Sequence, residues 1–190
     1  MRESREPLQL TYFGRLEYYK GIQHAIMALS DVNDSDLVAR LTIVGTGDYE
    51  NELREVARQF DRRNAVEFLP PMTYGESFLK WIRTQDVLLA PSLAPDTPRN
   101  AWDAIASGVP ILAYNTEYYD QLASTTGCVR LCAWNDIHAL AEQIRDLSKD
   151  RAALVAMKSR CRDAALANTQ ETWLRRRVEW TNDLFDSNGA

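Results

Sequence analysis

The sequence has little cysteine, little histidine and no long apolar run. Its three cysteines cannot all pair with one another, and so sparse and odd a number is typical of proteins of the reducing cytosol. No apolar stretch approaches the roughly 20 residues that a membrane-spanning helix needs, and the first ten residues lack the apolar segment of a signal peptide. These absences predict a cytoplasmic protein.

Basic residues are in the minority as well. The chain has 22 lysines and arginines against 27 acidic residues, which gives a net charge of −5 at pH 7. Binding to nucleic acid requires the opposite balance or a dense basic stripe, so we expect no nucleic-acid partner. An anion bound by this chain must be held by a few well-placed groups. With 190 residues, 45% of them hydrophobic, the chain has the size and composition of one globular domain, residues 1–190.

The sequence does contain a regular alternation of apolar runs and amphipathic stretches. The apolar runs, which we interpret as strands, cover residues 8–13, 39–44, 66–69, 86–91, 109–114 and, near an edge, 129–133. The spacing of apolar residues predicts helices at about 20–30, 50–60, 100–107, 137–147, 151–167 and 171–185. This order predicts an α/β fold, a doubly wound, Rossmann-like parallel sheet of about six strands with helices on both faces.

Sheets of this kind bind ligands at the carboxyl ends of their strands, where the strand order reverses. The loop after the first predicted strand contains Gly14, Arg15 and Lys20. Gly14 permits a tight turn, and two cations beside a helix N-terminus suit a diphosphate. The alternative is an ordinary polar loop with two solvated basic residues.

The loop after the second predicted strand reads Gly45-Thr46-Gly47. Glu50 stands where the dinucleotide fingerprint requires its third glycine, and the acidic residues at the start of the following helix would repel a phosphate. We therefore expect no NAD, FAD or other cofactor. The two glycines are interpreted as those of a tight strand-to-helix turn, and the sequence contains no phosphate-binding loop of the form G-x4-G-K-[ST].

The loop after the fourth predicted strand contains Asp96, Arg99, Asn100 and Asp103. If both acids were helical, seven residues would separate them by about 10 Å, whereas a retaining glycosidase needs its two carboxylates about 5 Å apart. The acids are therefore interpreted as acceptors for hydroxyl groups, and Arg99 and Asn100 fall at a helix start that favours anions. The alternative is that Asp96 caps a turn and Asp103 is solvated.

Other polar groups give weaker signals. His24 lies opposite the apolar stripe of its predicted helix and is expected to be exposed. Cys128 and Cys132 are four residues apart in a predicted strand, which places both thiols on the same side, but a second pair of zinc ligands is missing from the sequence. We therefore predict no metal site. Residues 175–177, all arginine, are interpreted as a solvated helix face.

Five segments, taken in order, resemble the C-terminal domain of the family 4 (group 1) glycosyltransferases, which have the two-domain GT-B fold. GRLEYYKGIQHAIMAL is similar to the G-R-L…K-G…A-I segment that opens that domain. LTIVGTGDYENEL and VEFLPPM resemble its I-V-G-x-G and V-x-F-L-G segments. DVLLAPSLAPDTPRNAWDAIASGVPILAY resembles the stretch P-S…E-A-x-A-x-G-x-P-V-[LIV]-A, and the tail from about residue 170 resembles the closing helix. The resemblance covers residues 8–185.

The resemblance implies the donor-binding half of a retaining, hexosyltransferase-like enzyme, which transfers a sugar from a nucleoside diphosphate to an acceptor hydroxyl. Arg15 and Lys20 would hold the diphosphate, and Asp103 would take the place of the second acid of the Glu-x7-Glu motif, which holds the donor ribose. Pro95 stands at the position of the first acid. Either the loop bulges so that Asp96, one residue later and a methylene shorter, serves as a catalytic residue beside Arg15 and Lys20, or the contacts to the donor sugar differ in this chain. The remaining donor-binding positions that we assign by this resemblance are Gly14, Gly45, Leu69, Arg99 and Asn100.

An enzyme of this kind also needs an N-terminal acceptor domain. We expect that domain to lie outside this chain, so that the chain alone is inactive and any membrane contact is made by the absent parts. Trp173 and Trp180 share one face of the closing helix. Part of this face is expected to pack on the chain's own core and part against the absent domain.

Two other functions stay open at this point. The departure at Pro95 and the shorter Asp103 motivate a degenerate, non-catalytic module that binds sugar nucleotides or a protein partner. An epimerase of the same fold is the third possibility, although the chain has few histidines and carboxylates for its proton chemistry. No metal is required if the placed cations neutralise the diphosphate.

Overall fold

The computed structural model describes residues 6–187, and the side chains among them up to residue 183. Its centre is a six-stranded parallel sheet with the strand order β3-β2-β1-β4-β5-β6. The strands are β1 (Leu8–Phe13), β2 (Ala39–Val44), β3 (Val66–Leu69), β4 (Val87–Ala90), β5 (Ile111–Tyr114) and β6 (Val129–Cys132). The strand order reverses between β1 and β4, which are neighbours in the sheet, so the predicted doubly wound fold is confirmed.

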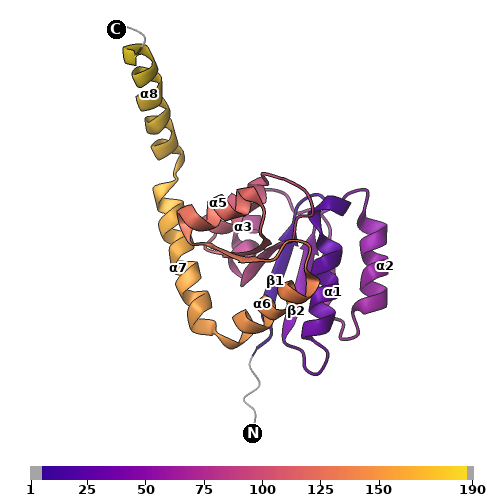
Figure 1. The fold of residues 1–190 in the computed structure, drawn as a ribbon. Helices are drawn as coiled ribbons and strands as arrows, with labels where there is room; N and C mark the ends of the chain where they lie inside the picture. Colours follow the sequence, from indigo (N-terminus) through magenta and orange to yellow (C-terminus); the bar gives the residue numbers. More distant parts are fainter. Residues whose placement is uncertain (1–5, 188–190) are drawn as a thin grey trace.

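Helices cover both faces of this sheet (Figure 1). One face packs against α1 (Ile22–Val32), α2 (Glu50–Phe60) and α6 (Ile137–Lys149), and the other against α3 (Glu76–Arg83), α4 (Arg99–Ala106) and α5 (Glu117–Thr126). The long α7 (Arg151–Ala167) contributes side chains to both sides, and α8 (Gln170–Ser187) follows it. In the part of the chain that the structure describes, no helix is long and apolar enough to cross a bilayer.

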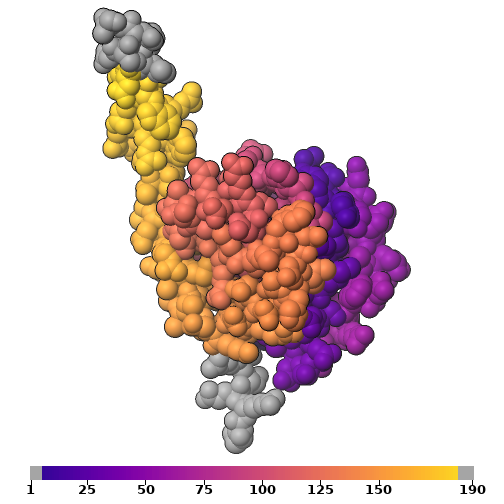
Figure 2. Space-filling model, viewed as in Figure 1, coloured from indigo at the N-terminus to yellow at the C-terminus, as the bar shows by residue number. Residues whose placement is uncertain are grey.

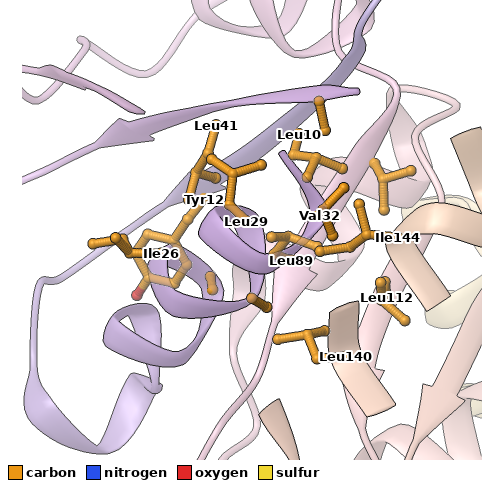
Figure 3. Close-up of a cluster of buried hydrophobic side chains, with 14 of the residues drawn as sticks. Leu10, Tyr12, Ile26, Leu29, Val32, Leu41, Leu89, Leu112, Leu140 and Ile144 are labelled. Atoms are coloured by element: carbon orange, nitrogen blue, oxygen red, sulfur yellow. The ribbon is translucent and has the colours of Figure 1, made fainter. Parts of the chain in front are cut away.

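The two faces of the sheet hold two separate apolar clusters. Side chains alternate between the faces along each strand, so Leu112 and Tyr114 of β5 pack with α1 and α6, while Ile111 and Ala113 pack with α4 and α5. Figure 3 shows the first cluster, in which Leu29 of α1 lies among strand and α6 side chains. Burying one such leucine or isoleucine stabilises the fold by about 1.5–3 kcal/mol.

Most predicted elements are present, with ends that differ by a few residues, but two helices were missed. These are α3, which has eight residues, and α5, whose sequence EYYDQLASTT is rich in tyrosine, serine and threonine. Such residues have a lower intrinsic helix propensity than alanine or leucine, and each helix buries only a short apolar face. Residues Phe78 and Ile82 of α3, and Tyr119 and Leu122 of α5, are buried.

The closing helix corrects one expectation. The helix α8 projects away from the body of the molecule, as Figures 1 and 2 show, and Trp173 and Trp180 are 43% and 53% exposed. The two indole rings contact each other at 6.2 Å between their centroids. The expected packing on the chain's own body is limited to the start of the helix, where Trp173 borders a hollow with Trp102 and Ala106 of α4, and no described residue of α8 belongs to either apolar cluster. The reason is that α7, at 17 residues and about 25 Å, ends at the rim of the body before α8 begins.

Candidate functional site

The loops that follow β1, β2 and β4 pack against one another through their backbones. The amide of Leu16 donates to the carbonyl of Thr46 at 3.0 Å, and the amide of Leu93 donates to the carbonyl of Tyr19 at 2.7 Å. Gly21 has a φ of 69°, and a Cβ there would lie 1.8 Å from the carbonyl oxygen of Pro91. A side chain at Gly21 would therefore separate the loops after β1 and β4.

A pocket of about 730 Å³ opens at this edge of the sheet. Its apolar lining comes from the ends of β1 and β2 and from the segment after β3, namely Phe13, Val44, Pro71, Met72 and Phe78. Its polar lining comes from the loops and from one face of α4, namely Gly14, Arg15, Gly45, Thr46, Tyr74, Arg99, Asn100 and Asp103. Such a combination of apolar walls and a few convergent polar groups is typical of a small-molecule site.

Six of the nine predicted site residues line this one pocket: Gly14, Arg15, Gly45, Arg99, Asn100 and Asp103. In the site, Arg15 is largely exposed, with its guanidinium 3.6 Å from Glu17. The side-chain amide of Asn100 donates to the carbonyl of Phe13 at 2.7 Å and ties α4 to the end of β1. Its Oδ1 is buried and has no hydrogen-bond partner among the described residues.

Lys20 and Asp96 form an ion pair beside the pocket. Lys20 ends the short 3-10 helix η1 (Tyr18–Lys20), and Asp96 lies in the loop before α4, so the pair joins the loops after β1 and β4. The side chains of Lys20 and Asp96 are only 12% and 19% exposed. Burial, and then the charge of Asp96, raise the pKa of Tyr12, whose hydroxyl donates to the carbonyl of Arg15 at 2.7 Å.

Asp103 has a partner that the sequence did not indicate. The hydroxyl of Tyr74, in the segment between β3 and α3, donates to Oδ1 of Asp103 at 3.1 Å. The charge of Asp103 and this hydrogen bond raise the pKa of Tyr74, so its phenol stays protonated. Nothing in the spacing of the sequence links two residues that are 29 positions apart, and only the fold brings them together.

The N-termini of α1 and α4 also face this edge. In the described part of the chain, neither helix receives a side-chain cap from the residue that precedes it, Gly21 for α1 and Pro98 for α4. Uncapped first-turn amides carry a partial positive charge and can donate to an anion. Arg99 and Asn100 are the first two residues of α4, which places two polar side chains beside these amides.

Several other residues lie elsewhere than expected. Leu69 ends β3 and packs against the second apolar cluster, while the segment just after it lines the pocket. His24 is half-buried rather than exposed, with Nδ1 3.0 Å from the hydroxyl of Tyr114, because α1 turns it towards β5.

The expectation about the cysteines needs correction. Cys128 and Cys132 do not share one side, because Cys128 precedes β6 and packs into the opposite cluster. The chain also contains an Asp-x-Asp triplet, Asp34 to Asp36, which lies before β2, at the other end of the sheet from the pocket. Among the described residues, no three histidine, cysteine or acidic side chains gather as a set of metal ligands.

A family model described as "Glycosyl transferases group 1" matches residues 2–165. A glycogen synthase of Mycobacterium tuberculosis is 30% identical over 147 residues, which are 77% of this chain and 35% of that protein. An α-monoglucosyldiacylglycerol synthase of Streptococcus pneumoniae is 27% identical over 115 residues, which are 60% of this chain and 26% of that protein. The chain thus spans well under half of the length of these relatives.

Solved structures share the fold at low identity. Anabaena HepE in complex with UDP superposes with a TM-score of 0.80 and 20% identity, over 93% of this chain and 49% of that one. The C-terminal domain of a group 1 glycosyl transferase family protein, LpcC of Francisella tularensis, superposes with a TM-score of 0.73 and 17% identity, over 85% of each chain.

Proposed function

Because the chain belongs to the group 1 glycosyl transferases, we propose that it binds a nucleoside-diphosphate sugar as the donor half of a retaining glycosyltransferase. In this proposal residues 1–190 form one donor-binding domain, and the acceptor is held by a further domain. The observation that carries the proposal is the composition of the pocket, where an apolar wall, the carboxylate of Asp103 and the cations of Arg15 and Arg99 meet at the point of strand reversal, next to the Lys20–Asp96 pair.

Each part of the pocket matches one part of such a donor. Phe13, Met72 and Phe78 offer apolar surface to a base. The carboxylate of Asp103 can accept hydrogen bonds from ribose hydroxyls. The cations of Arg15 and Arg99 line the pocket, and Lys20 and the uncapped starts of α1 and α4 belong to the loops beside it, where we place the diphosphate. A solved neighbour, HepE, was crystallised with UDP, which supports a diphosphate ligand.

The same groups give a mechanism for transfer. Charge develops on the diphosphate as its bond to the sugar breaks, and preorganised cations and amides stabilise that charge. Arg15 and Lys20 supply this stabilisation without a divalent metal ion. Once Lys20 turns to the phosphate, the carboxylate of Asp96 is free to accept a hydrogen bond from a sugar hydroxyl and orient the ring.

A second function is favoured by one observation. Pro95 stands where the resemblance expects an acid, and Asp96, which would replace it, is held by Lys20. A chain in which this pair does not open would bind a nucleoside diphosphate without orienting the sugar. That chain would be a non-catalytic binding module.

Titration calorimetry with UDP, GDP and ADP tests the proposal. We expect at least one of the three to bind, and the alanine variants of Lys20 and Arg15 to bind it more weakly. A hydrogen bond to a charged group contributes about 1.5–3 kcal/mol, or roughly one to two orders of magnitude in affinity, with the larger loss for the more buried Lys20. Arg58→Ala is the matched control for Arg15→Ala, because the Arg58 side chain is about as exposed as that of Arg15 but lies on α2, paired with Glu55.

Two results separate the candidate functions. A difference in affinity between UDP-glucose and UDP that disappears in Asp96→Ala supports the donor role, whereas equal affinities support the binding module. Failure of all three nucleotides to bind, or equal binding by the wild type and the Lys20 variant, would overturn the proposal. The donor half alone is expected not to release UDP from UDP-glucose, and measurable release would contradict that part.

A further inference from the structure

Tyr74 is an exposed aromatic residue that nevertheless has a defined polar contact. Its side chain is 68% exposed, lines the pocket, and contacts the ring of Phe78 at 6.0 Å between centroids. Its hydroxyl donates to Oδ1 of Asp103, which comes from α4 on another wall of the same pocket. An exposed tyrosine gains little by burial, so this hydrogen bond and the ring contact are what hold it at the pocket.

The hydroxyl of Tyr74 has capacity for a second hydrogen bond. A phenol carries one donor and can also accept, and its donor is used on Asp103. A proton donated to a carboxylate makes the phenol oxygen a better acceptor, because hydrogen bonds in a chain polarise one another. Oδ2 of Asp103 can accept independently. Together the two side chains present two acceptor positions, which match the two neighbouring hydroxyls of a ribose.

The short side chain of Asp103 explains why a second acceptor would be needed. An aspartate ends about 1.5 Å closer to its helix than a glutamate would, so its carboxylate reaches less far into the pocket. We propose that the Tyr74 hydroxyl completes the ribose site: Asp103 fixes the hydroxyl by accepting its proton, and Tyr74 Oη accepts a hydrogen bond from one ribose hydroxyl while Asp103 accepts from the other. This inference rests on the proposed function and makes Tyr74 a binding residue for the donor.

Two other roles for Tyr74 make opposite predictions. If its ring only stacks on the base, removing the hydroxyl leaves the affinity unchanged. If its hydroxyl only competes with the ligand for Asp103, removing it makes binding tighter. Only a ribose site shared by Tyr74 and Asp103 predicts that the loss of affinity on removing the hydroxyl depends on the ribose hydroxyls of the ligand.

The test measures binding of UDP, GDP and ADP, each beside its 2′,3′-dideoxy form, to the wild type and to Tyr74→Phe. We expect Tyr74→Phe to weaken binding of the ribonucleotide about threefold to tenfold, the range for one neutral hydrogen bond, and to leave the dideoxy form unchanged. Tyr18→Phe is the control, because Tyr18 is a similarly exposed tyrosine, 62% against 68%, whose ring contacts Tyr49.

A second variant tests the role of length. Asp103→Glu lets the carboxylate reach further, so adding Tyr74→Phe to Asp103→Glu should cost less than it does in the wild type. Circular dichroism of each variant checks that the fold is intact.

The outcomes are distinct. Equal loss with both forms of the nucleotide, no loss, or tighter binding would each overturn the role of the Tyr74 hydroxyl while leaving the proposed function intact. If none of the six nucleotides binds the wild type, the proposed function fails and this inference fails with it.

Discussion

Replacing Asp96 with asparagine removes the negative charge that Lys20 contacts and keeps the shape of the side chain. Asp96 is the charged partner of Lys20, the cation that we assign to the diphosphate. A nucleoside diphosphate must therefore compete with Asp96 for Lys20. Asp96→Asn removes the competitor, so we expect the variant to be less stable and yet to bind UDP more tightly.

The magnitude follows from the exposure of the two groups. Two unit charges 4 Å apart attract by about 4 kcal/mol at an effective dielectric constant of 20, and the loss of one partner of a buried pair costs about 3–5 kcal/mol. Lys20 and Asp96 keep 12% and 19% of their exposure, so solvent screening reduces the net effect to about 1–3 kcal/mol. For a chain of this size that loss lowers Tm by roughly 3–10 °C. Freeing Lys20 from Asp96 should strengthen UDP binding by a similar free energy, which is about one order of magnitude in affinity.

Thermal unfolding by circular dichroism and titration calorimetry with UDP measure the two effects on the same samples. Asp48→Asn is the matched control, because it removes one negative charge from the neighbouring loop after β2, where the side chain is exposed. Both effects should shrink in high salt, since they are electrostatic. A variant with wild-type Tm that binds UDP equally or more weakly would refute the competition between Asp96 and the diphosphate.

Three further predictions follow from the same structure. EDTA should leave UDP affinity unchanged, because Arg15 and Lys20 supply the positive charge; loss of binding that magnesium restores would contradict this. Burial lowers the pKa of His24 in the folded chain. As the pH falls through the unfolded value near 6.5, the unfolded chain takes up a proton before the folded chain does, so stability is lost. The Tm difference between pH 8 and pH 5.5 should therefore be smaller in His24→Gln than in the wild type. Gly21→Ala should reduce the free energy of unfolding in urea by at least about 2 kcal/mol, because it combines a left-handed backbone with a clash on Pro91.

The strands were predictable because their environment is uniform. A central parallel strand is apolar on both faces, so a run such as Val87–Ala90 in β4 stands out whatever it packs against. The helices α3 and α5 escaped prediction because each buries a short face of two main side chains, Phe78 with Ile82 and Tyr119 with Leu122. The sequence of α5 also has a modest helix propensity. The helix α8 was predicted, but its location was not, because a pattern of apolar residues does not specify which surface they meet.

The site residues were predictable by position, and their partners were not. A strand followed by a polar loop indicates the binding edge of the sheet, where Arg15, Lys20 and Asp96 lie. Their assignment to a single ligand came from the family resemblance. The sequence could not show that Lys20 and Asp96, 76 residues apart, contact each other, because that contact depends on β1 and β4 being neighbours. The Lys20–Asp96 contact changes how we interpret Pro95, which stands where the family pattern has its first acid. An acid placed one residue later than the family pattern is the counter-charge of the lysine, so we expect its position to affect donor affinity before it affects any contact with the sugar.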